Sequence, residues 1–139
     1  MSDFGADNSR AFGVALEETM QIARVAAGNL CDNVIDKTPV LTRNLQSGWR
    51  GTTEAGDVTE LPIQRVANIV PAETTKAKIR EAIAKWDGFK PFLLHNPVIY
   101  GVPIEYEGWS GKAPRGMVRV TAAQWPLFVQ DAVRQAGGH

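Results

Sequence analysis

Residues that bind metals or form crosslinks are scarce in this chain of 139 residues, which has one cysteine and two histidines. Cys31 is alone, so no disulfide can form within the chain and no cysteine-based metal framework exists. His95 and His139 belong to no His-x-x-x-His or His-Glu ligand pattern, and no glycine-rich stretch carries the Lys-Ser/Thr pair of a phosphate-binding loop. We therefore predict no metal site and no cofactor.

An excess of charge is also absent, because fifteen basic residues balance fifteen acidic ones. A neutral chain has no field that attracts a phosphate backbone from a distance, which disfavours dedicated nucleic-acid binding but leaves open a neutral ring around DNA. No apolar run approaches the length of about 18 residues that suggests a membrane-spanning helix. The first ten residues lack the pattern of a signal peptide. We expect a soluble protein without a membrane partner.

The length favours a single domain over residues 1–139, with flexible ends at 1–8 and 136–139. In the first third, apolar residues recur at three- and four-residue steps, as in Leu16, Met20, Ala23 and Leu30. This spacing predicts an amphipathic helix of about 28 residues, capped by Asn8 or Ser9 and ended at Thr38-Pro39. Two interpretations remain for it: a core helix, or a helix that packs partly on a neighbouring subunit.

The rest of the chain alternates strand and helix signals. We expect strands at 45–53, 58–65 and 89–95, with 67–70 ambiguous. We expect helices from 72 to 86, at 98–107 and at 115–135. Pro126 lies within the last of these, where it either kinks the helix or starts a new one. The predicted fold is α+β, with a small antiparallel sheet of three to four strands packed against a long N-terminal helix and a C-terminal helix.

The segment 95–119 is the densest in residues that a plain core would not need. It combines aromatic side chains with two carboxylates, Glu105 and Glu107, and with a corner rich in glycine and proline. Trp and Tyr dominate interface hot spots, although they also fill small cores. Arg115 could pair with either carboxylate. The residues we select as candidates for subunit or partner contacts are Trp49, Tyr100, Glu105, Tyr106, Trp109 and Arg115.

Two blocks of sequence resemble the signature of a phage tail-completion family, which includes minor tail proteins of the Z type and head–tail connector relatives. In the later block, the matching residues are Asn96, Tyr100, Glu105, Gly108, Ser110, Ala113, Pro114, Gly116 and Met117. The earlier block, from Thr38 to Trp49, resembles the family pattern Thr-Pro-Val-Asp-Thr-Gly-x-Leu-x-x-Ser-Trp. It departs from that pattern at Leu41, which replaces an aspartate, at Arg43, which replaces a glycine, and at the inserted Gly48.

The resemblance implies a structural virion protein of the phage neck, of the tail-completion or tail-terminator type, and not an enzyme. Copies would form a closed ring, with six subunits the expected number, in the tail or neck of a virion assembled in the host cytoplasm. The ring would contact the tail tube protein and the head-closure (stopper) protein, and DNA would pass through its lumen. No cofactor is implied.

Three alternatives remain. The chain could be the head-side stopper or adaptor of the connector. The ring could form only against its partners. The chain could instead be a small enzyme using His95 and Glu105, although Glu105 and Glu107 do not form a glycosidase pair, because residues two apart on a helix point in different directions.

Overall fold

The computed structural model describes residues 2–40, 43–53, 62–99, 105 and 118–137. These residues form a mostly helical structure with a small sheet, which confirms the prediction of a mixed helix-and-strand fold. The elements are α1 (Ser2–Lys37), α2 (Asn44–Ser47), β1 (Arg50–Thr52), α3 (Ala72–Ala84), β2 (Leu93–His95), α5 (Val118–Ala122) and α6 (Trp125–Gly137).

Helix α1 is longer than its apolar pattern predicts. It has 36 residues and therefore extends about 54 Å at 1.5 Å per residue. It begins at Ser2, so the expected start at Asn8 or Ser9 is wrong. Short polar residues can cap a helix, but they also continue one where no proline intervenes, and the first proline of this chain is Pro39.

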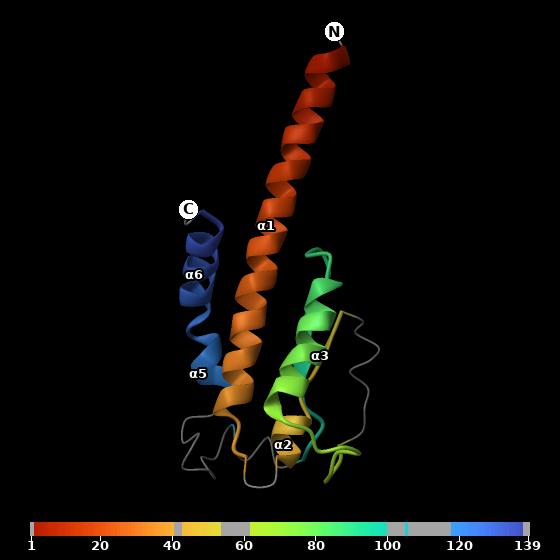
Figure 1. Ribbon diagram of the computed structural model, residues 1–139, viewed down its shortest axis with the longest axis vertical. Helices are drawn as coiled ribbons and strands as arrows, with labels where there is room; N and C mark the ends of the chain where they lie inside the picture. The colour runs from red at the N-terminus through yellow and green to blue at the C-terminus, as the bar shows by residue number, and fades with distance from the viewer. Residues whose placement is uncertain (1, 41–42, 54–61, 100–104, 106–117, 138–139) are drawn as a thin grey trace.

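The described helices lie in layers around α1 (Figure 1). Helices α5 and α6 pack on one side of the C-terminal half of α1, and α3 packs on the other side. Strand β1 lies against α3, with β2 beside it. The loop after α3 reaches α1 at Met20, where a side chain at Gly88 would contact Met20 Cγ. The N-terminal half of α1 projects beyond these layers, and most of its described side chains from Ser9 to Thr19 are exposed.

The sheet is smaller than predicted. Strands β1 and β2 pair antiparallel, with Arg50 opposite His95 and Thr52 opposite Leu93. The prediction of three to four strands is not confirmed, because Ile63 makes only an isolated parallel bridge to Val98. Half of the expected strand 58–65 lies outside the described residues, its other half has only the bridge at Ile63, and 67–70 forms no strand.

The expected strand 45–53 is wrong in its first half, because residues Asn44–Ser47 form α2. Arg43 precedes this helix with φ 60°, a left-handed conformation that turns the chain out of an extended path. The side chains of α2 are all buried, and three of them are polar with partners on other segments. These tertiary hydrogen bonds outweigh the local strand signal.

The C-terminal region expected to be helical at 115–135 contains two helices, α5 and α6, so of the two alternatives for Pro126 the structure has the one in which a new helix starts there. The Gln124 N–H donates to the Thr121 carbonyl at 2.9 Å, and α6 then begins at Trp125 with Pro126 in its first turn. Proline suits this position because its missing N–H would have no helical partner there. The expected helix 98–107 lies mostly outside the described residues.

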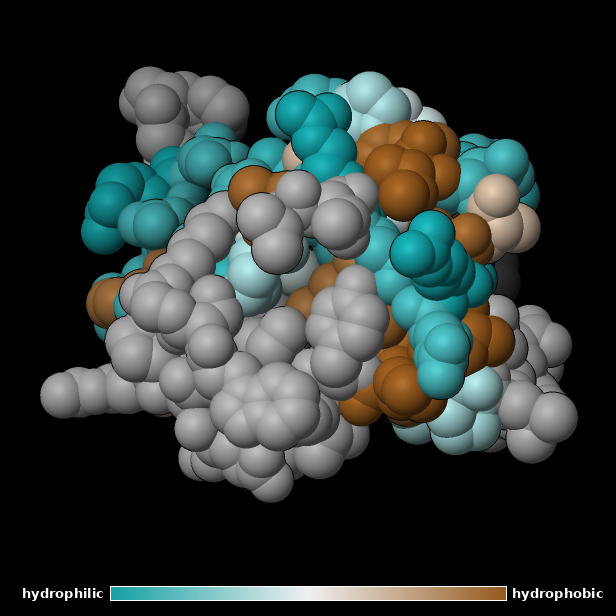
Figure 2. All heavy atoms as spheres, turned by 90° about the horizontal axis from the view of Figure 1, so that it is seen from below, coloured by the Kyte–Doolittle hydropathy of each residue, from teal (hydrophilic) through white to brown (hydrophobic). Residues whose placement is uncertain are grey.

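The core lies where α1, α2, α3 and the sheet meet. Its buried members are Cys31, Val34, Ile35, Leu45, Trp49, Ile79, Ile83 and Val98. Some large apolar side chains remain at the surface, including Ile69, Phe89 and Leu127, each more than half exposed. In the view from the α2 end, apolar residues reach the surface in several places on one side, between polar ones (Figure 2).

Candidate functional site

Asn96, the first residue of the later sequence block, meets the earlier block at α2, in a cluster that we call the motif junction: Thr38, residues 44–49 and Asn96. Asn44 fixes the segment after Pro62, because its Nδ2 donates to the Gln64 carbonyl at 2.7 Å and its Oδ1 accepts the Val66 N–H at 2.8 Å. Ser47 Oγ likewise accepts the Val70 N–H at 3.0 Å. These short side chains therefore hold an irregular segment against α2.

The same helix is also tied to the end of α1. Gln46 Nε2 donates to the Ile35 carbonyl at 3.2 Å. Trp49, just beyond α2, donates from Nε1 to Thr38 Oγ1 at 2.9 Å, and Thr38 Oγ1 in turn donates to the Val34 carbonyl at 2.8 Å. The first and last residues of the Thr38–Trp49 block are thus joined directly, which fixes the orientation of the indole ring.

Asn96 brings the later block to the same place. Its Nδ2 donates to the Leu45 carbonyl at 2.7 Å, and its Oδ1 accepts the Val98 N–H at 3.1 Å. Gly48 lies so close that an added Cβ would clash with Asn96 Oδ1 and lie 2.9 Å from Val98 Cγ2. The inserted glycine therefore allows the two blocks to approach each other.

Two of the six candidate contact residues are described, and both are buried. Trp49 is 7% exposed and belongs to the core cluster, so its ring offers little area to a partner. Glu105 is 6% exposed, and its Oε1 accepts the Val118 N–H at 2.6 Å, at the start of α5. The other candidates lie outside the described residues: Tyr100, Tyr106, Trp109 and Arg115. That any of the six contacts a partner stays a prediction.

The acid–base pair of the enzyme alternative is not assembled in this structure. His95 ends β2 opposite Arg50, whereas Glu105 binds the start of α5. No hydrogen bond or ion pair joins these two described residues. Glu105 therefore has a visible structural task, which is to hold α5.

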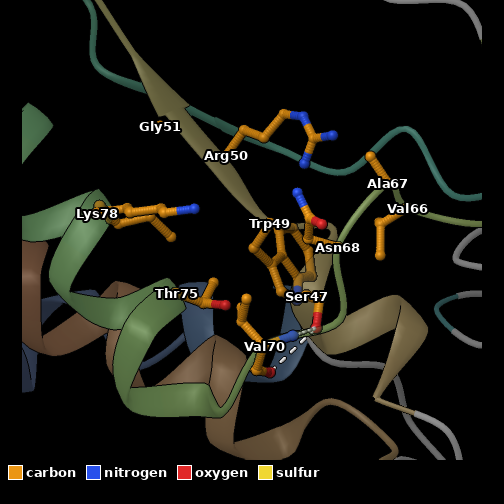
Figure 3. Close-up of a pocket in the computed structure, with 11 residues that line it drawn as sticks. Ser47, Trp49, Arg50, Gly51, Val66, Ala67, Asn68, Val70, Thr75 and Lys78 are labelled. Carbon is orange, nitrogen blue, oxygen red and sulfur yellow. Dashed lines mark hydrogen bonds between the residues drawn. The ribbon is translucent and has the colours of Figure 1, made fainter.

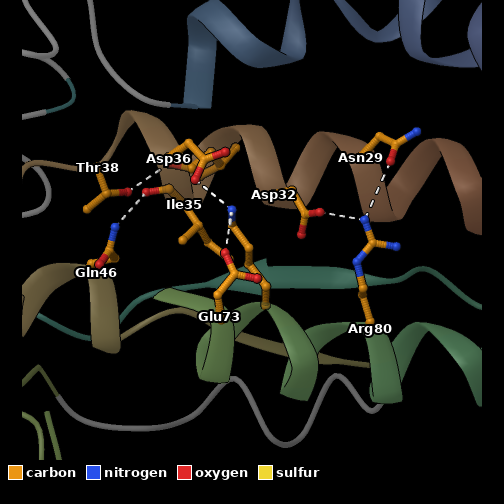
Figure 4. A network of polar contacts seen from close by, with 10 residues as sticks. Asn29, Asp32, Ile35, Asp36, Thr38, Gln46, Glu73 and Arg80 are labelled. Atoms are coloured by element: carbon orange, nitrogen blue, oxygen red, sulfur yellow. Dashed lines mark hydrogen bonds and ion pairs between the residues drawn. The ribbon is translucent and has the colours of Figure 1, made fainter. Parts of the chain in front are cut away.

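A second polar network joins α1 to α3 (Figure 4). Lys76 Nζ lies 2.7 Å from Asp36 Oδ1 and 3.5 Å from Glu73 Oε1. The hydrogen bond to Asp36 is the main cause that raises the pKa of Lys76 above its ordinary value of 10.5. One turn further along α3, Arg80 pairs with Asp32 and contacts Asn29. Each of these two cations of α3 is thus matched by a carboxylate of α1.

A cavity of about 350 Å³ lies on the other side of α3, between this helix and the segment 66–70 (Figure 3). Trp49 forms part of its wall, and Arg50 of β1 and Lys78 of α3 extend toward it. Thr75 lines the cavity with a buried hydroxyl that has no hydrogen-bond partner. Thr75 and Lys78 were not predicted from the sequence as site residues. The only signal for them in the sequence was that Lys78 lies off the apolar stripe of its helix.

Comparisons with family models, with curated proteins and with solved structures found no match for this chain. Among the described residues, no group of three or more His, Cys, Asp or Glu side chains is placed to hold a metal ion. Within the same part of the chain, no helix combines the length and the apolar character needed to cross a membrane.

Proposed function

We propose that this protein is a structural component of a phage neck, of the tail-completion type, that assembles as a ring joining the tail tube to the head-closure complex. In this proposal DNA passes through the lumen, six subunits form the ring, and the protein resides in the virion. The function lies in geometry: the ring matches the tail tube and ends its growth. A closed ring requires two different patches of each subunit to meet.

The observation that carries the proposal is the meeting of the two sequence blocks that resemble the family. Asn96 and Leu45 are 51 positions apart in the chain, yet their hydrogen bond of 2.7 Å joins the blocks directly. A chance likeness of two short motifs gives no reason for their residues to contact each other. Their contact in one buried junction supports the view that both belong to one inherited structural unit.

The backbone at Arg43 provides a second, independent support. The family pattern has glycine at this position, and the structure has φ 60° there. Glycine adopts this conformation without steric cost, whereas other residues seldom do. A left-handed backbone at the position where the family pattern has glycine supports the resemblance.

Two surfaces favour assembly. The N-terminal half of α1 projects from the molecule, and helical segments of this length are marginally stable in water without a packing partner. Helix α6 exposes Trp125, Leu127 and Val133 at 40%, 57% and 50%. We assign the contact between neighbouring subunits to these two surfaces, together with the candidate residues Tyr100, Tyr106, Trp109 and Arg115.

The sheet also gains a third strand in this proposal. Ile63 already forms a parallel bridge with Val98, its N–H donating to the Pro97 carbonyl at 2.9 Å. We infer that a third strand continues this pairing on the N-terminal side of Ile63, within the expected range 58–65, because Gln64 and Arg65 form a bend. Slow hydrogen exchange across these amides is the expected result, and exchange at the rate of an open chain would contradict it.

The test is the mass of the purified protein over a concentration series, alone and mixed with tail tubes or with head-closure complexes. Rings, or binding confined to tube ends, are the expected result. Binding to the head-closure complex alone would move the protein to the head side of the neck. A monomer at every concentration that binds neither partner would overturn the proposal.

A matched pair of variants on α6 sharpens this test. Leu127 and Gln130 are both exposed on the same helix, but only Leu127 offers an apolar side chain. Leu127→Ser should weaken ring formation or tube binding while the circular dichroism spectrum stays unchanged. Gln130→Ser should assemble like the wild type. Equal assembly of both variants would remove α6 from the interface.

A further inference from the structure

The cavity beside α3 has the composition of a binding site for an anionic group on an apolar body. Its volume of about 350 Å³ lies near the lower end of the range found for small-molecule pockets. Trp49, Val66, Val70 and Ile79 supply apolar wall, and none of the described residues that line the cavity is acidic. The polar lining residues instead carry hydrogen-bond donors.

The cations around α3 divide into two classes. Lys76 and Arg80 face α1 and are each paired with one of its carboxylates, Asp36 and Asp32. Lys78 lines the cavity, and no described residue forms a hydrogen bond or an ion pair with it. The Lys78 side chain is exposed beside apolar wall, and its ammonium group has no counter-charge among the described residues, so it can bind an anion.

Thr75 is the second, independent observation. The residue is 3% exposed and its Oγ1 has no hydrogen-bond partner. In Figure 3 this oxygen points from α3 toward the Trp49 side of the cavity. Leaving a buried hydroxyl unpaired costs about 1–3 kcal/mol, so such groups are rare in native proteins. A ligand oxygen in the cavity would supply the missing partner.

Two further donors complete the site. The Asn68 side chain is exposed at the cavity rim with no hydrogen bond to a described residue. Arg50 extends toward it from β1 (Figure 3), with Nη1 donating to the Gly48 carbonyl at 3.0 Å. Arg50 therefore already has a hydrogen-bond partner, whereas Lys78 is the lining cation that pairs with no described residue, and one carboxylate is enough to pair with it.

We propose that this cavity binds a monocarboxylate with an apolar body, whose carboxylate lies between Lys78, Thr75 and Asn68 and whose hydrocarbon part lies along Trp49. The ligand could be a free small carboxylate or a carboxylate presented by a neighbouring protein chain, and the recognition chemistry is the same in both cases. This inference concerns only described residues and does not depend on the neck assignment.

The experiment is a titration of the ¹⁵N-labelled protein with hexanoate, followed by the backbone amide signals of residues 66–70 and the indole N–H signal of Trp49. Hexylamine and hexanol, which share the hydrocarbon chain but lack the carboxylate, are the ligand controls. Saturable shifts with hexanoate alone are the expected result. Absence of shifts, or equal shifts with all three compounds, would overturn the proposal.

A matched pair of lysine variants tests the assigned charge. Lys78→Met should weaken hexanoate binding about tenfold, the loss of one charge-assisted hydrogen bond. Lys85→Met removes a lysine that follows the same helix, pairs with Glu81 at 3.5 Å and lies outside the cavity lining, so it should bind hexanoate like the wild type. Equal affinities of the two variants would contradict the assignment.

The same titration at high protein concentration, followed by the mass of the assembly, distinguishes the two sources of the carboxylate. If a neighbouring chain supplies the carboxylate, hexanoate should compete with that chain and lower the mass of the assembly. The Lys78→Met variant should then have a lower mass even without hexanoate. If the ligand is a free carboxylate, hexanoate should bind without changing the mass. Failure of ring formation with normal hexanoate binding would overturn the neck proposal and leave this one standing.

Discussion

Asn96 Oδ1 occupies the space beside Gly48 that a Cβ at this position would need. The same asparagine binds the Leu45 carbonyl through Nδ2 at 2.7 Å, so its side chain occupies the space that any residue larger than glycine would need. Gly48 has φ −83°, an ordinary conformation for any residue. The position therefore requires glycine because of this contact and not because of its backbone angles.

Substitution of Gly48 by alanine should destabilise the protein. The added methyl group would displace Asn96 or Val98, which are both held by hydrogen bonds. Overpacking of this kind costs about 1–3 kcal/mol. Urea denaturation followed by tryptophan fluorescence measures the change, and a variant as stable as the wild type would show that Asn96 can move aside without cost.

Gly13→Ala is the matched control, because a Cβ at Gly13 meets no atom within 4 Å. Gly13 lies inside α1, where alanine is favoured over glycine by about 0.5–1 kcal/mol. We expect a small gain in helix content by circular dichroism, in contrast to the loss at Gly48. A destabilised Gly13→Ala variant would indicate that this part of α1 packs more tightly than the structure shows.

Arg43→Gly should stabilise the protein. Arg43 has φ 60° and makes no side-chain capping bond to α2. A left-handed conformation costs a non-glycine residue about 1–2 kcal/mol, which the substitution would remove. The larger conformational freedom of glycine in the unfolded chain offsets about 0.5–1 kcal/mol of this gain in stability. We expect a net gain below about 1 kcal/mol in thermal or urea denaturation.

The control for this variant is Arg43→Ala, which removes the same charge but keeps a Cβ. It should not stabilise the protein, because the backbone strain at φ 60° remains. If both variants gain equally, the effect comes from the lost charge and the left-handed turn is not the cause.

Two buried threonines should respond oppositely to the same change. Thr38 Oγ1 accepts the Trp49 indole N–H at 2.9 Å and donates to the Val34 carbonyl at 2.8 Å. Thr38→Val would leave the buried indole N–H unpaired, at a cost of about 1–3 kcal/mol. Thr75 Oγ1 has no partner to lose, so Thr75→Val should be neutral or stabilising. Urea denaturation of both variants is the measurement.

A loss of stability in Thr75→Val would mean that the hydroxyl has a partner in solution, such as a buried water. The same variant should bind hexanoate more weakly if the cavity is a carboxylate site. A gain in stability combined with weaker binding is therefore the expected pattern, whereas Thr38→Val should lose stability and retain the cavity. This pattern would separate a residue kept for binding from one kept for folding.

The helices followed from periodicity because their apolar faces pack against the body of the protein. The stripe containing Ile79 and Ile83 predicted α3, and both residues are buried in the core. Pro126 indicated either a kink or a new helix, and the structure has it in the first turn of α6, where its missing N–H costs no hydrogen bond. The start of α1 was not predictable in this way, since the first turns of the helix project beyond the layers that the other described elements form.

The error at residues 45–53 has a different cause. Leu45 and Trp49 are apolar residues of the kind that strands contain, but Asn44, Gln46 and Ser47 are buried because they bind backbone groups of other segments. Such partners are distant in sequence, so no local pattern reveals them. The cavity was missed for the same reason: Thr75 and Lys78 look like ordinary surface residues until α3 lies beside the segment 66–70.

Cys31 should react slowly in the folded protein. The same thiol should also make the folded protein less stable at alkaline pH. Burial is the main cause that raises the pKa of the Cys31 thiol from 9.0 to about 12, and the neighbouring Asp32 adds to the rise. Because the thiolate is the reactive form, alkylation by iodoacetamide at pH 8 should be slow in buffer and fast in denaturant. Fast alkylation of the folded protein would mean that α1 opens away from α3.

The effect on stability follows from the direction of that shift. A raised pKa in the folded state means that the folded protein holds the proton more tightly than the unfolded chain. The contribution of Cys31 is therefore constant below pH 9 and is lost as the pH rises from 9 toward 12. The slope from this group is at most about 1.4 kcal/mol per pH unit. Lys76, whose pKa is also raised, adds a loss of the same sign at its own higher pH.

Comparison with Cys31→Ala isolates the thiol from Lys76 and from the other groups that titrate in alkali. The variant loses some packing in the core, so its absolute stability should be lower at neutral pH. Its stability should nevertheless decline less steeply than that of the wild type above pH 9, because the buried thiol is gone. Parallel declines of the two proteins in urea denaturation would show that Cys31 can ionise in the folded state without the cost that its burial implies.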